Sequence, residues 1–140
     1  MDKCRVMLVD DHVAIRVALR RLLAHYHGLR IVGEASDGHQ AIELMERCRA
    51  HVILMDINMP RMNGIEATAV IKRSWKEAIV IGLCAVEDPH HTHAIMKAGA
   101  AAVISKHQVN ALYYTIQQVC LNNPSMLTTQ LVPGGLHGCR

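Results

Sequence analysis

The chain has 140 residues, of which 51% are hydrophobic and 19% charged, so it holds enough apolar material for one compact domain and does not resemble a disordered chain. Aromatic residues make up only 3% and Phe is absent, so we expect an aliphatic core. The formal charge of +3 is mild and the basic residues are scattered, which argues against a nucleic-acid-binding surface in this chain.

The cysteines and the N-terminus indicate the cellular compartment. Five cysteines include no C-x-x-C pair, which fits reduced thiols better than a disulfide framework or a zinc site. The N-terminal residues lack the apolar stretch and cleavage site of a signal peptide, and no window approaches the roughly 20 apolar residues of a membrane span. We therefore expect a cytoplasmic protein that has no membrane partner.

Short apolar runs alternate with longer amphipathic segments. In chain order, the patterns predict strand 6–9, helix 13–25, strand 31–33, helix 38–48, strand 52–55, helix 65–74, strand 79–83, helix 90–98, strand 102–104 and helix 109–121. Continuous apolar runs suit parallel strands that are covered on both faces. The order predicts an α/β domain over residues 1–121, with a doubly wound five-stranded parallel sheet and helices on both faces.

The last segment, residues 122–140, has a different composition. Asn122-Asn123-Pro124-Ser125 interrupts the last predicted helix, and Pro133-Gly134-Gly135 is a second break nearer the C-terminus. We expect a linker-like or mobile C-terminal tail there.

Polar residues follow four of the predicted strands. Asp10 and Asp11 follow the first, Asp56 the third and Cys84 the fourth, and Lys106 comes shortly after the fifth. Because the carboxyl ends of parallel strands meet at one edge of the sheet, these side chains should converge. A single Asp at a strand end usually caps a helix, but capping does not explain three Asp and a Lys at matching strand ends.

This combination of charges predicts a specific chemistry. Three neighbouring carboxylates raise one another's pKa unless a cation is present, and hard oxygen ligands with room for water suit Mg²⁺. Beside that ion, Asp56 can remain ionised and attack phosphorus, while Lys106 neutralises charge on the phosphoryl oxygens.

Several motifs match one known family. The sequence resembles the CheY-like (flavodoxin-like) receiver domains of two-component response regulators over roughly residues 4–121, in Leu8-Val9-Asp10-Asp11-His12, Leu54-Met55-Asp56-Ile57-Asn58-Met59-Pro60, Gly64, Ala98-Gly99-Ala100 and Ser105-Lys106. It is most similar to receivers of the LuxR/NarL-FixJ type, which carry a DNA-binding effector domain.

The resemblance implies a role for each matching residue. Asp56 corresponds to the phosphoacceptor, which receives its phosphoryl group from a sensor histidine kinase. Asp11 corresponds to a direct Mg²⁺ ligand, Asp10 to an acid that holds the ion through water, and Asn58 to a backbone-carbonyl ligand. Lys106 corresponds to the lysine that contacts the phosphoryl group. Such a domain catalyses its own phosphorylation and dephosphorylation and is not a turnover enzyme.

Two positions depart from the family pattern. Cys84 stands where the family has Thr or Ser, and a thiol is a weak hydrogen-bond donor. Val103 stands where the family usually has Tyr or Phe. Either phosphorylation persists with an altered relay, or the domain is a phosphorylation-independent dimerisation or interaction module. A third interpretation makes Cys84 a redox sensor beside the phosphorylation site.

Two enzyme or cofactor alternatives share features with this pattern. A haloacid-dehalogenase-like phosphatase needs a second acid where Asn58 stands. A flavin-binding domain needs a phosphate-cradling loop where Asp10 and Asp11 would repel a phosphate. Both are disfavoured.

The resemblance also implies an output face. It is formed by helix 90–98, strand 102–104 and helix 109–121, and we expect a homodimer or an effector contact there, with Tyr113, Tyr114, Gln117 and Gln118 as exposed candidates. Control of transcription would require an effector domain that these residues do not contain. We therefore expect no DNA binding by this chain alone.

Overall fold

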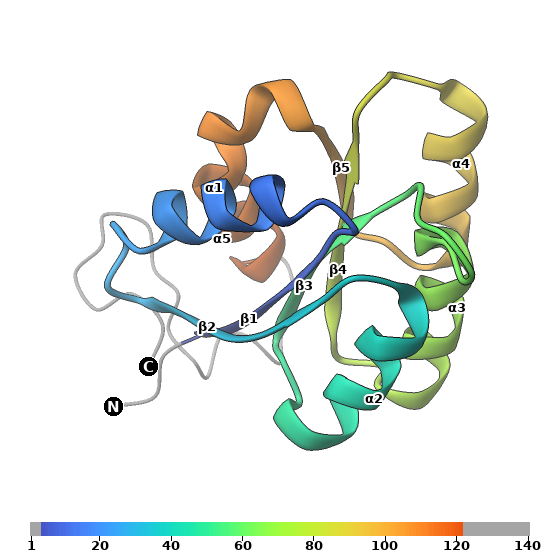
Figure 1. Cartoon of the computed structure of the whole chain (residues 1–140), viewed down its shortest axis with the longest axis horizontal. Helices are drawn as coiled ribbons and strands as arrows, with labels where there is room; N and C mark the ends of the chain where they lie inside the picture. The colour runs from blue at the N-terminus through green and yellow to red at the C-terminus, as the bar shows by residue number, and fades with distance from the viewer. Residues whose placement is uncertain (1–3, 122–140) are drawn as a thin grey trace.

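The computed structural model describes residues 4–121, so the predicted tail 122–140 lies outside the described residues. Strands and helices alternate along this part of the chain (Figure 1). In chain order they are β1 (Cys4–Val9), α1 (Val13–Leu23), β2 (Leu29–Ala35), α2 (Gly38–Cys48), β3 (Val52–Asp56), α3 (Gly64–Ser74), β4 (Ile79–Cys84), α4 (Pro89–Ala98), β5 (Ala102–Ser105), a 3₁₀ segment (Lys106–Ala111) and α5 (Leu112–Leu121).

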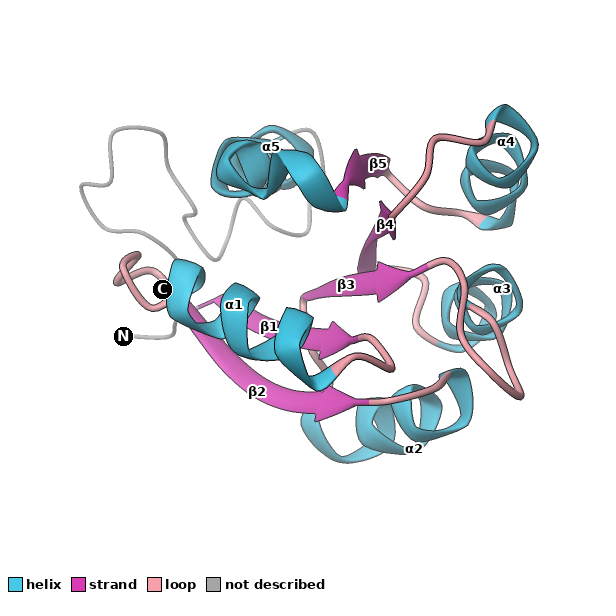
Figure 2. Ribbon diagram, turned by 45° about the horizontal axis from the view of Figure 1, so that its top comes forward, coloured by secondary structure: helices cyan, strands magenta, loops and turns pink. Residues whose placement is uncertain are grey.

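The five strands form one parallel sheet in the order β2-β1-β3-β4-β5. Helices α1 and α5 pack against one face, and α2, α3 and α4 against the other (Figure 2). The predicted doubly wound α/β fold is therefore confirmed. Among residues 4–121, no helix has both the length and the apolar character needed to cross a membrane.

The core has one hydrophobic layer on each face of the sheet. In β1, Val6 and Leu8 pack in the layer beneath α1 and α5, whereas Met7 and Val9 pack in the layer beneath α2, α3 and α4. This alternation follows from the twofold side-chain periodicity of a strand, and both faces are covered, which explains the continuous apolar runs. The largest fully buried side chains are Leu, Ile and Met, as the composition predicted.

Side-chain caps determine where several helices begin. The Asp37 carboxylate accepts the Gln40 amide at the start of α2, and Asn63 and Glu66 form a reciprocal capping box at α3. Asp88 caps α4 by accepting the His90 amide. Asp37, Asn63 and Asp88 lie in loops at the carboxyl edge of the sheet, so these caps also hold the loops around the site.

The last helix begins later than predicted. Residues 106–111 form a 3₁₀ segment, and α5 itself begins at Leu112 instead of residue 109. The Ser105 hydroxyl accepts the His107 amide, and Gln108 interrupts the turn with non-helical φ and ψ angles of −121° and 31°. Local capping after β5 therefore outweighs the helical periodicity that begins at Val109.

Two of the residues expected on the output face are not exposed. The Tyr113 ring stacks on Tyr26, with 3.8 Å between the ring centroids, and the Gln117 amide donates to the Tyr113 hydroxyl over 3.2 Å. Gln117 is buried. The expectation was therefore wrong for Tyr113 and Gln117, while Tyr114 (64% exposed) and Gln118 remain available for contacts.

Candidate functional site

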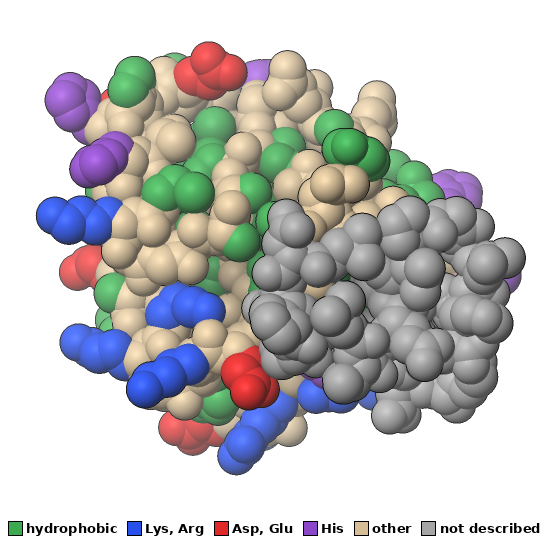
Figure 3. Space-filling model, turned by 180° about the vertical axis from the view of Figure 1, so that it is seen from behind, with side chains coloured by type: hydrophobic (Ala, Val, Ile, Leu, Met, Phe, Trp, Pro, Cys, Tyr) green, Lys and Arg blue, Asp and Glu red, His purple; other side chains and the backbone are tan. Residues whose placement is uncertain are grey.

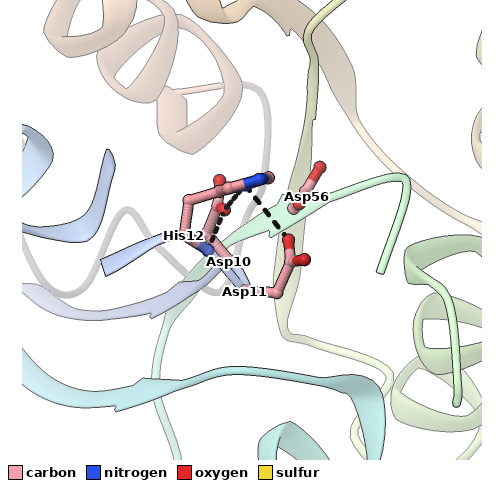
Figure 4. Close-up of side chains that lie close together, drawn as sticks. All are labelled: Asp10, Asp11, His12 and Asp56. Carbon is pink, nitrogen blue, oxygen red and sulfur yellow. Dashed lines mark hydrogen bonds and ion pairs between the residues drawn. The ribbon is translucent and has the colours of Figure 1, made fainter. Parts of the chain in front are cut away.

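The carboxyl edge of the sheet brings the predicted charged residues together. Asp10 and Asp11 directly follow β1, Asp56 is the last residue of β3, and Lys106 directly follows β5. Figure 4 shows Asp10, Asp11 and Asp56 around one space, together with His12. Asp10 is fully buried, Asp56 is 2% exposed and Asp11 is half-buried, so the cluster forms a pocket of carboxylates and not a solvated acidic surface.

The lysine lies between two of the carboxylates. Lys106 Nζ is 2.7 Å from Asp10 Oδ2 and 3.2 Å from Asp56 Oδ1. The Asn58 amide also donates to Asp56 Oδ1, over 3.3 Å. The other oxygen, Asp56 Oδ2, is buried and has no hydrogen-bond partner in the described part of the chain. One oxygen of Asp56 is thus held in place while the other points into the site without a partner.

Burial shifts the protonation equilibria of both groups. Desolvation and, to a smaller extent, the negative charge of Asp10 raise the pKa of Asp56 to about 7, although the contact with Lys106 opposes both effects. For Lys106, burial lowers the pKa, but the hydrogen bond to Asp10 and the charges of Asp56 and Asp10 outweigh it, so its pKa is raised. The ammonium group of Lys106 therefore does not fully offset the cost of ionising Asp56 beside Asp10.

A divalent cation would supply further positive charge. Three carboxylates and one ammonium group, when all are ionised, carry three negative charges and one positive charge, a net charge of −2. The oxygens of Asp10, Asp11 and Asp56 lie within 4.8 Å of one another. Oxygen ligands at a partly open site suit Mg²⁺. The residues that the sequence predicted as metal ligands therefore fit this ion. For Asn58, ligation through its carbonyl stays a prediction.

Two nearby side chains were not predicted from the sequence. His12 Nδ1 lies 3.1 Å from Asp10 Oδ1 and 3.2 Å from Asp11 Oδ1. Arg16 donates to the Asp10 carbonyl and pairs with Glu34. The position of His12 beside the Asp pair was visible in the sequence, but the direction of its ring depends on the turn into α1.

The loop after β3 is locked against the backbone of Asp56. A Cβ atom at Gly64 would lie 2.1 Å from the Asp56 carbonyl oxygen, so only glycine fits there, and the Gly64 amide donates to the Ile57 carbonyl over 2.9 Å. Further along the loop, Arg61 pairs with the buried carboxylate of Asp37. The Gln40 amide and Arg61 together hold the pKa of Asp37 below its usual value. This network fixes Asp56 relative to α2 and α3.

Cys84 ends β4 and lines a hollow beside the charged cluster. The hollow has a volume of about 580 Å³, and its lining includes Cys84, Met96, Val103, Ser105 and Gln108. In the view from behind, hydrophobic side chains lie next to the histidines at the start of α4 (Figure 3). Burial raises the pKa of the Cys84 thiol, and the charge of Glu87 adds to this effect. A neutral thiol is a poor nucleophile, so the interpretation of Cys84 as a redox sensor is not supported.

Comparison with known proteins identifies the family. The family model for the response regulator receiver domain matches residues 6–117 of the sequence. The chain is 40% identical over 101 residues to the response regulator UvrY of Escherichia coli K12. The matched region covers 72% of this chain and 46% of UvrY. It is 34% identical over 105 residues to the transcriptional regulatory protein DegU of Brevibacillus brevis. That matched region covers 75% of this chain and 44% of DegU.

A solved structure gives the same result. The LuxR-family two-component response regulator of Aurantimonas sp. SI85-9A1 superimposes with a TM-score of 0.81 at 26% identity, covering 91% of this chain and 94% of that one. The chain spans about half the length of the curated relatives that it matches. On the family match, the sequence identities and the shared fold, the chain belongs to the response regulator receiver domains of two-component systems.

Proposed function

We propose that residues 1–121 form a phosphoacceptor receiver in which Asp56 takes a phosphoryl group from a phosphohistidine of a sensor histidine kinase. The observation that carries this proposal is the state of Asp56: it is buried, and one of its oxygens has no hydrogen-bond partner among residues 4–121, while Lys106 contacts the other. A carboxylate held in this way is ready to act as a nucleophile.

The proposed step is a displacement at phosphorus. A carboxylate oxygen of Asp56 forms a bond to phosphorus, the phosphorus–nitrogen bond of the donor breaks, and its electron pair stays on the histidine. Lys106 lies close enough to Asp56 to contact the transferred group and neutralise part of its charge. Asp56 needs no general base because it reacts as the carboxylate. The domain would catalyse its own phosphorylation and dephosphorylation and not act as a turnover enzyme.

The proposed Mg²⁺ ligands are Asp11, Asp56 and the carbonyl of Asn58, with Asp10 holding the ion through water. When bound, Mg²⁺ supplies the positive charge that keeps Asp56 ionised and neutralises the phosphoryl oxygens. The raised pKa of Asp56 and the three converging carboxylates support this assignment.

The relay from Asp56 to the output face involves Cys84 and Val103. Cys84 is the proposed contact to the phosphoryl group from β4, in place of a hydroxyl. Its thiol donates weakly, and the lining of the hollow that contains Val103 includes no Tyr, Phe or Trp side chain. Because Asp56, the neighbouring carboxylates and Lys106 are all in place, we favour an altered relay in which phosphorylation persists. A phosphorylation-independent interaction module is the second candidate, and it rests on Cys84 and Val103.

The output would be control of transcription. UvrY is named a response regulator and DegU a transcriptional regulatory protein, and each extends well beyond the matched region. We propose that this receiver acts in the cytoplasm through a DNA-binding effector domain and does not bind DNA by residues 1–121 alone. The face formed by α4, β5 and α5 would form a homodimer or meet the effector, with Tyr114 and Gln118 as exposed contacts.

Beryllofluoride, which imitates a phosphoryl group on a carboxylate, tests the proposal. ¹⁹F NMR should show a bound signal that requires Mg²⁺ and is absent from Asp56→Asn. The matched control is Asp88→Asn, which removes an exposed carboxylate that caps α4, outside the cluster. A bound signal that survives in Asp56→Asn, or none in the wild type, would favour the phosphorylation-independent module.

A further inference from the structure

The imidazole of His12 gives the cluster a ligand type that Mg²⁺ does not need. In the described residues, one group of His, Cys, Asp and Glu side chains is arranged to hold a metal ion, and it contains His12 together with Asp10, Asp11 and Asp56. In Figure 4 the His12 ring reaches toward the same space as the three carboxylates. The buried Asp56 Oδ2, which has no hydrogen-bond partner among residues 4–121, also marks this space as a ligand position.

The distances fit a shared ion. With metal–ligand bonds of about 2.1 Å, neighbouring ligands of an octahedral ion lie about 3 Å apart and opposite ligands about 4.2 Å apart. His12 Nδ1 is 3.2 Å from Asp11 Oδ1, which matches neighbouring positions, and 3.1 Å from Asp10 Oδ1, the acid that would hold the ion through water. The four candidate ligand atoms lie within 4.8 Å of one another, so small movements would bring those of His12, Asp11 and Asp56 around one ion, with Asp10 linked to it through water.

The ring of His12 is not needed for another structural purpose. His12 stands at the N-cap position of α1 but forms no side-chain cap, and its side chain is 63% exposed. The contacts described for its ring are those with Asp10 and Asp11. The backbone amide of His12, and not the ring, supplies the 2.8 Å hydrogen bond that orients Asp10.

We propose that His12 supplies a nitrogen ligand to the divalent-ion site, so that this site binds first-row transition-metal ions such as Mn²⁺ and Co²⁺ as well as Mg²⁺. Imidazole suits transition metals, whereas Mg²⁺ prefers oxygen ligands, and the affinity of a mixed nitrogen and oxygen site rises from Mn²⁺ to Co²⁺. The consequence is competition: a transition-metal ion would occupy the cluster at concentrations well below those of Mg²⁺. This inference rests on the proposed metal site.

Calorimetric titrations of the whole chain with Mg²⁺ and Co²⁺ measure the preference. In His12→Ala and His12→Gln the affinity for Co²⁺ should fall by about 10-fold or more, because removing a direct ligand should cost at least as much as removing a group that only orients a ligand. The affinity for Mg²⁺ should change by less than about threefold, because carboxylates hold that ion. The matched control is His107→Gln, which removes an exposed imidazole next to Lys106 but outside the cluster.

Pulsed EPR of one equivalent of Mn²⁺ gives a direct readout of the nitrogen ligand. The wild type and His107→Gln should show ¹⁴N coupling from a directly bound imidazole, and both His12 variants should lose it. Coupling that persists without His12, or that is absent from the wild type, overturns the inference. If Asp11→Asn leaves Mn²⁺ binding unchanged, the proposed metal site fails as well. If Asp11→Asn abolishes Mn²⁺ binding but the wild type with bound Mn²⁺ shows no nitrogen coupling, only the role of His12 fails.

Discussion

Replacing Asp56 by Asn removes a buried ionisable group but preserves its size. The Asn carbonyl can still accept hydrogen bonds from Lys106 and from the Asn58 amide, which contact Asp56 Oδ1 in the wild type. Asn cannot ionise, so the variant isolates the free energy of holding a carboxylate next to Asp10. We expect the metal-free variant to be more stable than the metal-free wild type at neutral and alkaline pH.

The sign follows from the pKa of Asp56, which burial raises from 3.8 to about 7 in the folded protein. Well below pH 3.8 the group is protonated in both the folded and the unfolded states and contributes no pH dependence. Between these two values the unfolded chain loses the proton first, so the free energy of unfolding falls as pH rises. Above about pH 7 the loss is complete and constant.

The magnitude follows from the same two values. At about 1.36 kcal/mol per pH unit, the difference between 3.8 and 7 corresponds to about 4 kcal/mol. This value is an upper limit, because relaxation of the structure around the Lys106 contact reduces the cost of the buried carboxylate. We therefore expect Asp56→Asn to raise the free energy of unfolding by about 2–4 kcal/mol above about pH 7. The gain should shrink toward zero near about pH 4. Saturating Mg²⁺ should stabilise the wild type and narrow the difference, because the ion binds the folded state.

Urea denaturation in EDTA at several pH values between about 4 and 8 measures this difference. Asp88→Asn is a control that should change the free energy of unfolding in the opposite direction. The backbone amide of His90 lowers the pKa of Asp88, so the carboxylate of Asp88 stabilises the fold. Removing it should destabilise the protein at about pH 8. A metal-free wild type that is as stable as Asp56→Asn at that pH would refute the reasoning.

Three further substitutions test other parts of the site. Gly64→Ala places a methyl group against the Asp56 carbonyl oxygen, so urea denaturation should show a loss of about 1–3 kcal/mol, and an unchanged midpoint would contradict the contact. Lys106→Met should slow phosphorylation by acetyl phosphate about 10-fold or more, and an unchanged rate would exclude Lys106 from charge neutralisation. Cys84→Thr restores a strong donor, so beryllofluoride should shift the NMR signals of Val103 more than in the wild type; equal shifts would mean that Cys84 does not limit the relay.

The fold was predictable because its signals are local. The inner strands β1, β3 and β4 contain continuous apolar runs, since both faces of the sheet are covered, whereas the edge strand β2 also carries Arg30 and Glu34. Each Asp or Lys of the cluster lies at or just beyond a strand end. Parallel pairing then brings Asp10, Asp56 and Lys106 to one edge, whatever the details of the loops.

Features that depend on loop geometry were not predictable. The ring of His12 reaches the carboxylates only because the chain is extended at the start of α1, with φ and ψ angles of −98° and 113°. The pair between Arg61 and Asp37 joins two loops that are distant in sequence. Tyr113 looked exposed from its position in the last helix, but it stacks on Tyr26, a contact that sequence periodicity does not encode.

The central claim is that Asp56 accepts a phosphoryl group in a reaction that needs a divalent ion. Intact-protein mass spectrometry after incubation with acetyl phosphate, with Mg²⁺ or with EDTA, tests it most directly. We predict a single phosphoryl adduct with Mg²⁺ in the wild type and in Asp88→Asn, and none in EDTA or in Asp56→Asn. An adduct of equal yield in Asp56→Asn, or one that forms equally well in EDTA, would contradict the assignment of Asp56 and its metal site.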